Sequence, residues 1–266
     1  MFFSWMGGSE MKNYKDYVSK MSFLVKPSDP VPKDMQLKLD SKLHPLPTLT
    51  DVKNVKLPFK DKATKTLLGD ICKIPKMCTF AIGALINLIV SEMPKDLVFI
   101  NVGVWYGFSF FCGIVNNPNK KCVGVDNFTE FCNDAVKKAF YEKFAIFRGH
   151  DQAKHLFFDI DYLEYFEKRH EGKIGFYAYD ADHRKEAMCR ALTIAEPFFA
   201  DDCLVLLDDI NWPHVMNGIE EFFEQSNYEY DILVKQHTCD HIHPSFWNGI
   251  LLMQKRKDEN PDSSSI

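Results

Sequence analysis

The chain has 266 residues, 46% of them hydrophobic, with a formal net charge of −5 and a pI near 6.0. This composition allows a large buried core, and lysines scattered among acids exclude the basic footprint of a nucleic-acid-binding surface. Eight cysteines form no C-x-x-C pair, which predicts reduced thiols in a cytoplasmic protein rather than a disulfide framework. The opening residues lack the basic segment of a signal peptide, and the longest apolar stretch (80–90) is shorter than the roughly 20 residues of a membrane span.

The N-terminal part of the chain, residues 1–78, is predicted to be an extension that is partly irregular. Prolines interrupt it repeatedly, as in "VKPSDPVPKD" (25–34). The next segment, 79–93, is predicted to be an amphipathic helix with Thr79 as its N-cap. Its apolar residues recur at helical spacing: Ile82, Leu85, Ile86 and Ile89.

From residue 97 onward, apolar strands alternate with helices. The predicted strands are 97–102, 121–126, 154–159, 174–180, 203–209, 230–237 and 248–255. The predicted helices between them are 109–115, 133–144, 161–170, 184–198 and 217–226. This alternation predicts an α/β fold, a Rossmann-like, doubly wound, seven-stranded and mostly parallel sheet with helices on both faces. The domain spans 79–255, and the polar tail 256–266 is predicted to be disordered.

In such a sheet, ligands bind beyond the carboxyl ends of the strands, so the residues at those ends matter most. The first strand leads into "INVGVWYGFS" (100–109), in which Gly103 and Gly107 bracket a tight turn and Ser109 can cap the following helix. The alternative is that these two glycines only allow the turn to form and contact no ligand. The pattern is not the G-x-G-x-x-G of dinucleotide sites. Its absence favours a ligand other than a dinucleotide.

Two further strands end in candidate nucleoside contacts. Asp126 ends the second strand, where an acid can accept both hydroxyls of a ribose, or it can serve as a helix or turn cap. Asp161 and Tyr162 follow the third strand and would flank the base of a nucleoside; alternatively, Asp161 is the N-cap of its helix.

The fourth and fifth strands both end in pairs of acids. "GFYAYDADH" (175–183) carries Asp180 and Asp182, and "CLVLLDDINW" (203–212) carries Asp208 and Asp209. We expect these four carboxylates to converge, and like charges so close require a cation between them. Hard oxygen ligands favour Mg²⁺, Mn²⁺ or Ca²⁺ over zinc. The alternative is that the second pair forms only a turn and a helix cap.

Taken in order, these segments resemble class I S-adenosylmethionine-dependent methyltransferases, and most closely the small O-methyltransferases of the catechol and caffeoyl-CoA type and their sugar-modifying relatives. The resemblance covers about 79–255 and rests on "NVGVWYGFS", "VGVD", "DIDY", "YDADH" and "LVLLDDINW". It implies a divalent metal ion on Asp180, Asp208 and Asp209. It also implies a set of residues that bind S-adenosylmethionine: Asn101, Gly103, Gly107, Ser109, Asp126, Asp161, Tyr162 and Asp180.

Two positions depart from the family pattern. Asn101 stands where the family usually has an acid, and His183 stands where a lysine often serves as the base. A histidine can take that proton, so His183 and Asp180 are the predicted catalytic residues. Trp212 and His214 are candidates to line the acceptor pocket.

A later segment, "HTCDHIHPSFW" (237–247), could be interpreted as a zinc cluster. Its cysteine and histidines have a spacing that fits no closed structural site, so we predict a loop on the acceptor side.

The predicted function is metal-assisted O-methylation of a small molecule or glycan hydroxyl, without nucleic-acid or membrane partners and with a homodimer left open. Two alternatives come from other classes. One is a nucleoside-binding pseudoenzyme or binding protein that has lost methyl transfer, suggested by Asn101 and the missing lysine. The other is a nicotinamide-dependent oxidoreductase, which the absent G-x-G-x-x-G contradicts.

Overall fold

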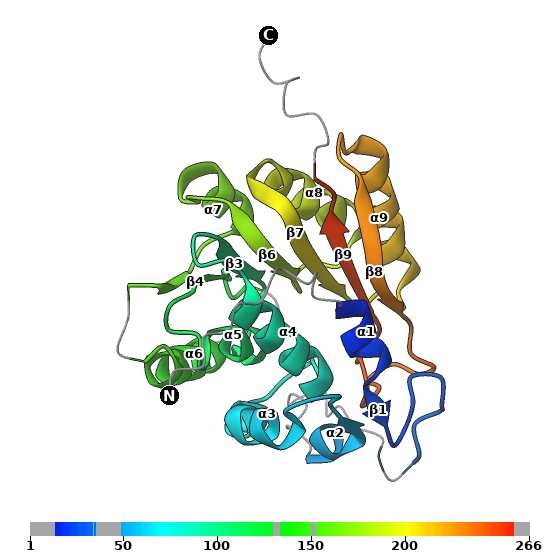
Figure 1. Cartoon of the computed structure of the whole chain (residues 1–266). Coiled ribbons are helices and arrows are strands. Elements are labelled where there is room, and N and C mark those ends of the chain that lie inside the picture. Colours follow the sequence, from blue (N-terminus) through cyan, green and yellow to red (C-terminus); the bar gives the residue numbers. More distant parts are fainter. Residues whose placement is uncertain (1–13, 34, 36–48, 130–133, 150–152, 258–266) are drawn as a thin grey trace, which may run out of the picture.

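The computed structural model describes residues 14–33, 35, 49–129, 134–149 and 153–257. Its centre is a seven-stranded sheet in the order β5-β4-β3-β6-β7-β9-β8 (Figure 1). The strands are β3 (Val98–Val102), β4 (Lys121–Val125), β5 (His155–Phe158), β6 (Ile174–Tyr179), β7 (Phe199–Asp208), β8 (Tyr230–Gln236) and β9 (Ile250–Lys255). β9 runs antiparallel to both of its neighbours, whereas the other pairings are parallel. The predicted mostly parallel α/β sheet is confirmed.

The central strand β3 lies between β4 and β6, and this arrangement positions the site. After β5 the chain crosses back over β4 and β3 to form β6, so the strand order reverses at β3. In register, Val102 at the end of β3 pairs with Val125 of β4 and with Tyr179 of β6. The segments that follow these three strands therefore emerge at one edge, which is where an open α/β sheet binds its ligands.

Helices cover both faces of the sheet. They are α4 (Phe80–Glu92), α5 (Phe108–Ile114), α6 (Asp134–Phe147), α7 (Tyr162–Lys168), α8 (Lys185–Ala195) and α9 (Pro213–Gln225). Side chains of α4, α5 and α6 form one hydrophobic cluster with the sheet, and those of α7, α8 and α9 form a second cluster on the other face. Burial of these apolar faces is the main stabilising contribution to the fold. The helices predicted between the strands are all found, with ends shifted by a few residues.

The described part of the N-terminal extension packs against the same core. It contains α1 (Tyr14–Ser19), β1 (Ser22–Phe23), α2 (Leu49–Asn54), β2 (Val55–Lys56), α3 (Asp61–Leu68) and a 3₁₀ turn η1 (Ile71–Lys73). Tyr17, Leu57 and Leu68 are buried in the cluster that also contains α4. The predicted tail lies outside the described residues from 258 onward.

The start of α4 is fixed by a side chain from α2. The Asp51 carboxylate accepts the backbone N–H of Phe80 at 2.9 Å and forms an ion pair with Lys76, and both partners of this pair are about 95% buried (side-chain exposures 5% and 4%). Thr79 occupies the N-cap position, but its hydroxyl donates to the carbonyl of Ser245 at 2.6 Å instead. Thr79 is therefore the N-cap residue, as predicted, but its side chain does not cap the helix, because a carboxylate 29 residues away in the chain accepts the Phe80 N–H.

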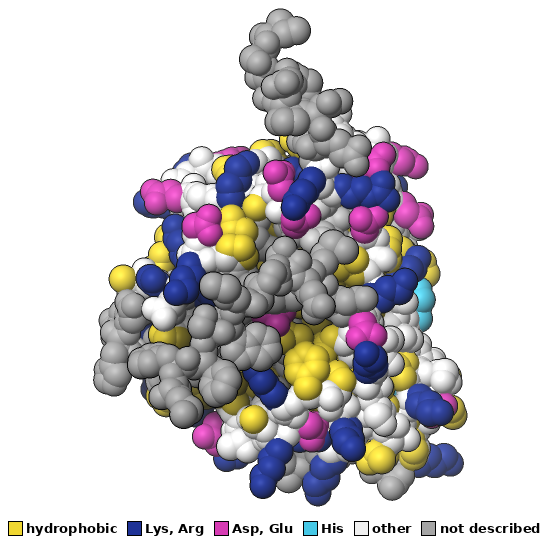
Figure 2. All heavy atoms as spheres, in the orientation of Figure 1, with side chains coloured by type: hydrophobic (Ala, Val, Ile, Leu, Met, Phe, Trp, Pro, Cys, Tyr) yellow, Lys and Arg dark blue, Asp and Glu magenta, His cyan; other side chains and the backbone are white. Residues whose placement is uncertain are grey.

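Charged side chains of both signs lie on the surface (Figure 2), and most of the described cysteines are buried. Figure 2 shows basic and acidic side chains interspersed over the face drawn. None of the helices among the described residues has both the length and the apolar character needed to cross a membrane. The seven cysteines in the described ranges are free thiols, of which only Cys239 is exposed.

Candidate active site at the carboxyl edge of the sheet

The turn after β3 brings the backbone close to the neighbouring strand. Gly103 has φ of +78°, and a Cβ at this position would lie 1.8 Å from the carbonyl oxygen of Asp180. Gly107 has φ of +99° and is itself the N-cap residue of α5. Ser109 lies inside the helix rather than at its cap, so that part of the prediction was wrong: a left-handed glycine ends the turn without side-chain help.

Asp126 fixes the shape of this turn. One carboxylate oxygen accepts the backbone N–H groups of Val104 and Trp105, at 2.9 and 2.8 Å. The other accepts the N–H of Phe128 at 2.7 Å. Trp105 has φ of +48°, a conformation that a bulky residue adopts only when its surroundings impose it. Contact between Asp126 and a ribose stays a prediction, and its carboxylate is already an organising element of the turn.

The residues predicted to flank a nucleoside base lie after β5. The Asp161 carboxylate accepts the backbone N–H of Leu163 at 2.8 Å and is the N-cap of α7. The Tyr162 ring packs edge-on against the Tyr179 ring, with centroids 5.8 Å apart. Asp161 therefore has the N-cap role that was the alternative to base contact, and Tyr162 lies beside Tyr179, the last residue of β6.

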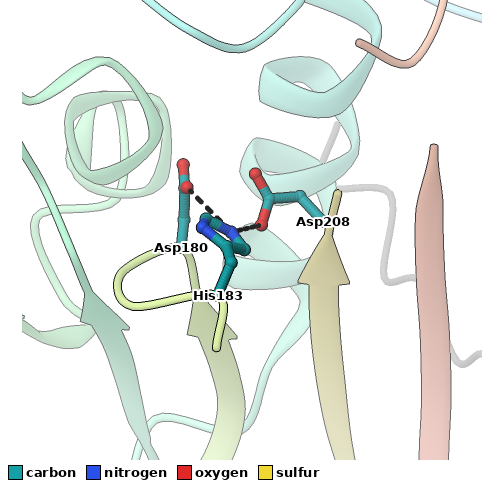
Figure 3. A group of neighbouring side chains, drawn as sticks. All are labelled: Asp180, His183 and Asp208. Atoms are coloured by element: carbon teal, nitrogen blue, oxygen red, sulfur yellow. Dashed lines mark hydrogen bonds and ion pairs between the residues drawn. The ribbon is translucent and has the colours of Figure 1, made fainter. Parts of the chain in front are cut away.

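Three carboxylates and one imidazole converge where β6 and β7 end. Asp180 follows β6, Asp208 is the last residue of β7, and His183 lies in the turn between β6 and α8; all three point toward one another in Figure 3. His183 Nε2 lies 3.2 Å from Asp208 Oδ1, 3.6 Å from Asp209 Oδ2 and 3.8 Å from Asp180 Oδ1. Among the described residues, Asp180, His183 and Asp208 are the group whose donor atoms could share one metal ion.

Burial and mutual repulsion perturb these groups strongly. Burial, with the charge of Asp208 added, raises the pKa of Asp180 well above its usual value. The same two causes raise the pKa of Asp209 to about 7. Burial alone would lower the pKa of His183, but its hydrogen bond to Asp208 and the surrounding carboxylates outweigh burial and raise that pKa to about 10. The surrounding carboxylates thus favour the protonated form of the ring.

Asp182 does not join the cluster, contrary to the prediction that all four acids converge. Its carboxylate accepts the backbone N–H of Arg184 at 3.0 Å and pairs with the guanidinium of the same residue. These local bonds turn it toward the start of α8.

Asn248 is a residue of the site that the sequence did not reveal. Its amide nitrogen donates to Asp209 Oδ1 at 2.8 Å, and its amide oxygen accepts the backbone N–H of Ile242 at 2.8 Å. Asp209 has φ of +54°. The buried Asn248 side chain thus connects the loop before β9 to this carboxylate and fixes its orientation.

A small cavity lies behind the cluster. Its polar lining comes from Cys78, Asn101, Ser109, Asp180 and Asp208, and its apolar wall comes from Ile82, Ile86, Ala178 and Leu206. Asn101 is fully buried, and its amide nitrogen makes two long bonds of 3.4 Å to the carbonyls of Val102 and Gly103. Its Oδ1 has no hydrogen-bond partner. A buried unpaired acceptor is costly, which indicates that a ligand or water with a donor group belongs in this cavity.

The loop between β8 and β9 does not gather its metal-binding residues. His243 is buried and bonds to the hydroxyl of Ser245 and the carbonyl of Asp29. His241 stacks on Trp212, with centroids 4.5 Å apart and an angle of 14° between the rings. The described residues of this loop hold no candidate metal group, so the interpretation as a zinc cluster is not supported.

The geometry agrees with comparisons to known proteins. Residues 100–210, which include the glycine turn, Asp180 and Asp208, match a family model described as "Methyltransferase domain". The chain thus contains a segment that is similar to a methyltransferase domain. No curated protein matches the sequence of this chain.

Solved structures share the fold of this chain at low sequence identity. An O-methyltransferase from Bacillus cereus in complex with SAH has 14% identity and a TM-score of 0.51, over 74% of this chain and 92% of that chain. Cofactor-bound Rv0187 from MTB has 12% identity and a TM-score of 0.52, over 74% and 89%. A candidate caffeoyl-CoA O-methyltransferase from Staphylococcus aureus has 12% identity and a TM-score of 0.51, over 73% and 91%.

Proposed function

We propose that this protein is an S-adenosylmethionine-dependent methyltransferase that transfers the methyl group to a hydroxyl of a small molecule or sugar and uses a divalent metal ion to do so. The observation that carries the proposal is the convergence of Asp180, Asp208 and Asp209 around His183. The structural neighbours add support, because one is an O-methyltransferase in complex with SAH and another is a candidate caffeoyl-CoA O-methyltransferase.

The turn after β3 fits the S-adenosylmethionine cofactor. Gly103 lets the turn lie directly against the backbone of Asp180, and the unpartnered Asn101 Oδ1 can accept a hydrogen bond from an amino group. The Asp126 carboxylate has lone pairs beyond its three backbone bonds and can still accept from a ribose hydroxyl. The further proposed contacts are Gly107, Ser109, Asp161, Tyr162 and Asp180. The bound cofactor supplies a methyl group that its sulfonium already activates.

The carboxylate cluster fits a divalent cation. Three carboxylates this close together repel one another unless positive charge lies between them, and within the described ranges their only ion-pair partner is His183. Hard oxygen ligands suit Mg²⁺, Mn²⁺ or Ca²⁺. An ion held there would make a bound acceptor hydroxyl more acidic.

The chain's own residues would then align the acceptor and remove one proton. Asn248 keeps the Asp209 carboxylate in place. His183 is the predicted proton acceptor, although the pKa of about 10 requires that it first lose the proton it holds among the carboxylates. Trp212 and His214 are exposed at the start of α9, three and five residues after Asp209, and are proposed to contact the acceptor.

Calorimetric titration of S-adenosylhomocysteine tests the cofactor site. The proteins to compare are wild type, Asp126→Ala and the matched control Asp182→Asn, whose carboxylate lies outside the cluster. We expect wild type and the control to bind, and Asp126→Ala to lose at least about tenfold in affinity, equivalent to about 1.4 kcal/mol.

Transfer of labelled methyl groups to a panel of phenols and sugars, with and without Mg²⁺ or Mn²⁺, tests the reaction. Transfer that a chelator abolishes supports the proposal. Binding without transfer to any acceptor would favour a protein that has lost turnover. Absence of binding would refute the proposed cofactor site.

A further inference from the structure

His183 lies where a ligand of the proposed metal ion would lie. Its Nε2 is 3.2, 3.6 and 3.8 Å from one oxygen each of Asp208, Asp209 and Asp180. Nitrogen and oxygen ligands lie about 2.1 Å from a first-row metal ion, so two ligands of one ion at right angles or tetrahedral angles are roughly 3.0–3.5 Å apart. The observed separations need only small movements to reach this range.

The ring is also held on the correct side of the cluster. His183 is three residues after Asp180, in the turn that connects β6 to α8, and its ring points toward the carboxylates of Asp180 and Asp208 (Figure 3). Its Nε2 also lies 3.6 Å from Asp209 Oδ2. The pairing of β6 with β7 places Tyr179 beside Leu207, so the residues that follow these two strands meet at one edge. The imidazole thus belongs to the same set of donor atoms as the acids.

A second observation points to a ligand at this place. The cavity that Asp180 and Asp208 line is also lined by Asn101, which is fully buried and whose Oδ1 has no partner. No described lysine or arginine pairs with Asp180, Asp208 or Asp209. Among the described residues, no lysine or arginine therefore compensates the charge of these carboxylates.

We propose that His183 is a direct ligand of the metal ion and that the site consequently selects a first-row transition-metal ion, such as Mn²⁺, Fe²⁺ or Co²⁺, over Mg²⁺. Mg²⁺ prefers oxygen ligands and retains several waters, whereas imidazole suits the transition metals and carboxylates also accept Mn²⁺. A donor set of the His183 nitrogen with the carboxylates of Asp180 and Asp208 therefore favours the latter ions. The inference rests on the proposed function, because it concerns the same ion.

This assignment gives His183 a role other than the proton acceptor. A ring whose Nε2 binds the ion cannot use that atom to take a proton from the acceptor hydroxyl. The ligand role and the base role therefore exclude each other at Nε2, and an experiment that detects the metal–nitrogen bond decides between them.

Binding of Mn²⁺ followed by electron paramagnetic resonance tests the inference without any need for turnover. The proteins to compare are wild type, His183→Gln and His237→Gln; His237 is an exposed histidine of the β8–β9 loop. We expect wild-type Mn²⁺ to show the ¹⁴N coupling of an imidazole, and His183→Gln to lose it together with about tenfold or more of its Mn²⁺ affinity. Competition by Mg²⁺ should require at least a tenfold excess in wild type, and His237→Gln should behave as wild type.

The outcomes separate the inference from the proposed function. Mn²⁺ bound without ¹⁴N coupling, or displaced equally well by Mg²⁺, would overturn the ligand role of His183 and leave metal-assisted methylation intact. If wild type binds S-adenosylhomocysteine but neither ion, the metal-assisted mechanism and the inference both fail. The ¹⁴N measurement on wild type remains decisive even if His183→Gln does not fold, and far-UV circular dichroism reports whether it does.

Discussion

The ion pair between α2 and the start of α4 should be one of the most sensitive points of the fold. Asp51→Ala would leave the Lys76 ammonium buried without its carboxylate partner. Water would not replace that partner, because the Lys76 side chain is only 4% exposed. Loss of one partner of a buried pair costs about 3–5 kcal/mol, and loss of an N-cap costs about 1 kcal/mol more. We therefore expect the free energy of unfolding to fall by about 4–6 kcal/mol, which for a chain of this size lowers Tm by roughly 10 °C or more.

Urea unfolding followed by circular dichroism measures this effect. Lys76→Met in the same background provides the control, because the double variant Asp51→Ala/Lys76→Met no longer contains an isolated buried charge. The double variant should therefore recover all but about 1–2 kcal/mol, mainly the lost bond to Phe80 N–H. If the two single effects simply add, or if Asp51→Ala costs less than about 1 kcal/mol, the pair does not act as the buried contact that we describe.

Four further predictions address the site and its surroundings. Gly103→Ala should lower stability by about 2 kcal/mol or more in urea titration, because its Cβ would lie 1.8 Å from a carbonyl oxygen; unchanged stability would contradict the turn geometry. Asp126→Ala should also lower Tm, since three backbone N–H groups lose their acceptor. Asp126→Asn keeps one acceptor oxygen and should lower Tm less. Asp208→Asn should weaken Mn²⁺ binding by about tenfold or more in the paramagnetic titration, and an unchanged affinity would exclude Asp208 as a ligand. Burial lowers the pKa of His170 to about 4, below the unfolded value, so stability should fall as pH falls from about 6.5 to 4; His170→Phe should show a smaller fall over that range in urea midpoints.

The acids at the strand ends could be predicted from the sequence because an apolar strand decides where the residue after it lies. Asp180 and Asp208 follow runs that are buried throughout, and the pairing of β6 with β7 brings them together. Asp182 could not be placed in the same way. Its carboxylate bonds to Arg184, only two residues away, and these local contacts keep it from joining Asp180 in the cluster.

Contacts between distant segments could not be predicted. Asp51 caps α4 from 29 residues away, and Asn248 reaches Asp209 across 39 residues. Neither partner lies in a periodic pattern or a motif that marks the pairing. The prediction of Ser109 as the cap of α5 was wrong for a different reason. Gly107 and Ser109 both lie near the end of the turn, and only the left-handed φ of Gly107, which a sequence does not show, identifies it as the N-cap residue.

The antiparallel direction of β9 has a consequence for how acceptor choice can evolve. Because Ile250 at the start of β9 pairs with Asp208, the β8–β9 connection (237–249) lies at the same edge as the carboxylates although it is the last loop of the domain. The turn proposed to hold the cofactor (103–109), by contrast, lies more than a hundred residues earlier in the chain. Hairpin ends tolerate insertion and exchange better than the strands they connect. Natural variation or loop grafting at this one hairpin can therefore change the proposed acceptor side while the proposed cofactor turn is inherited unchanged.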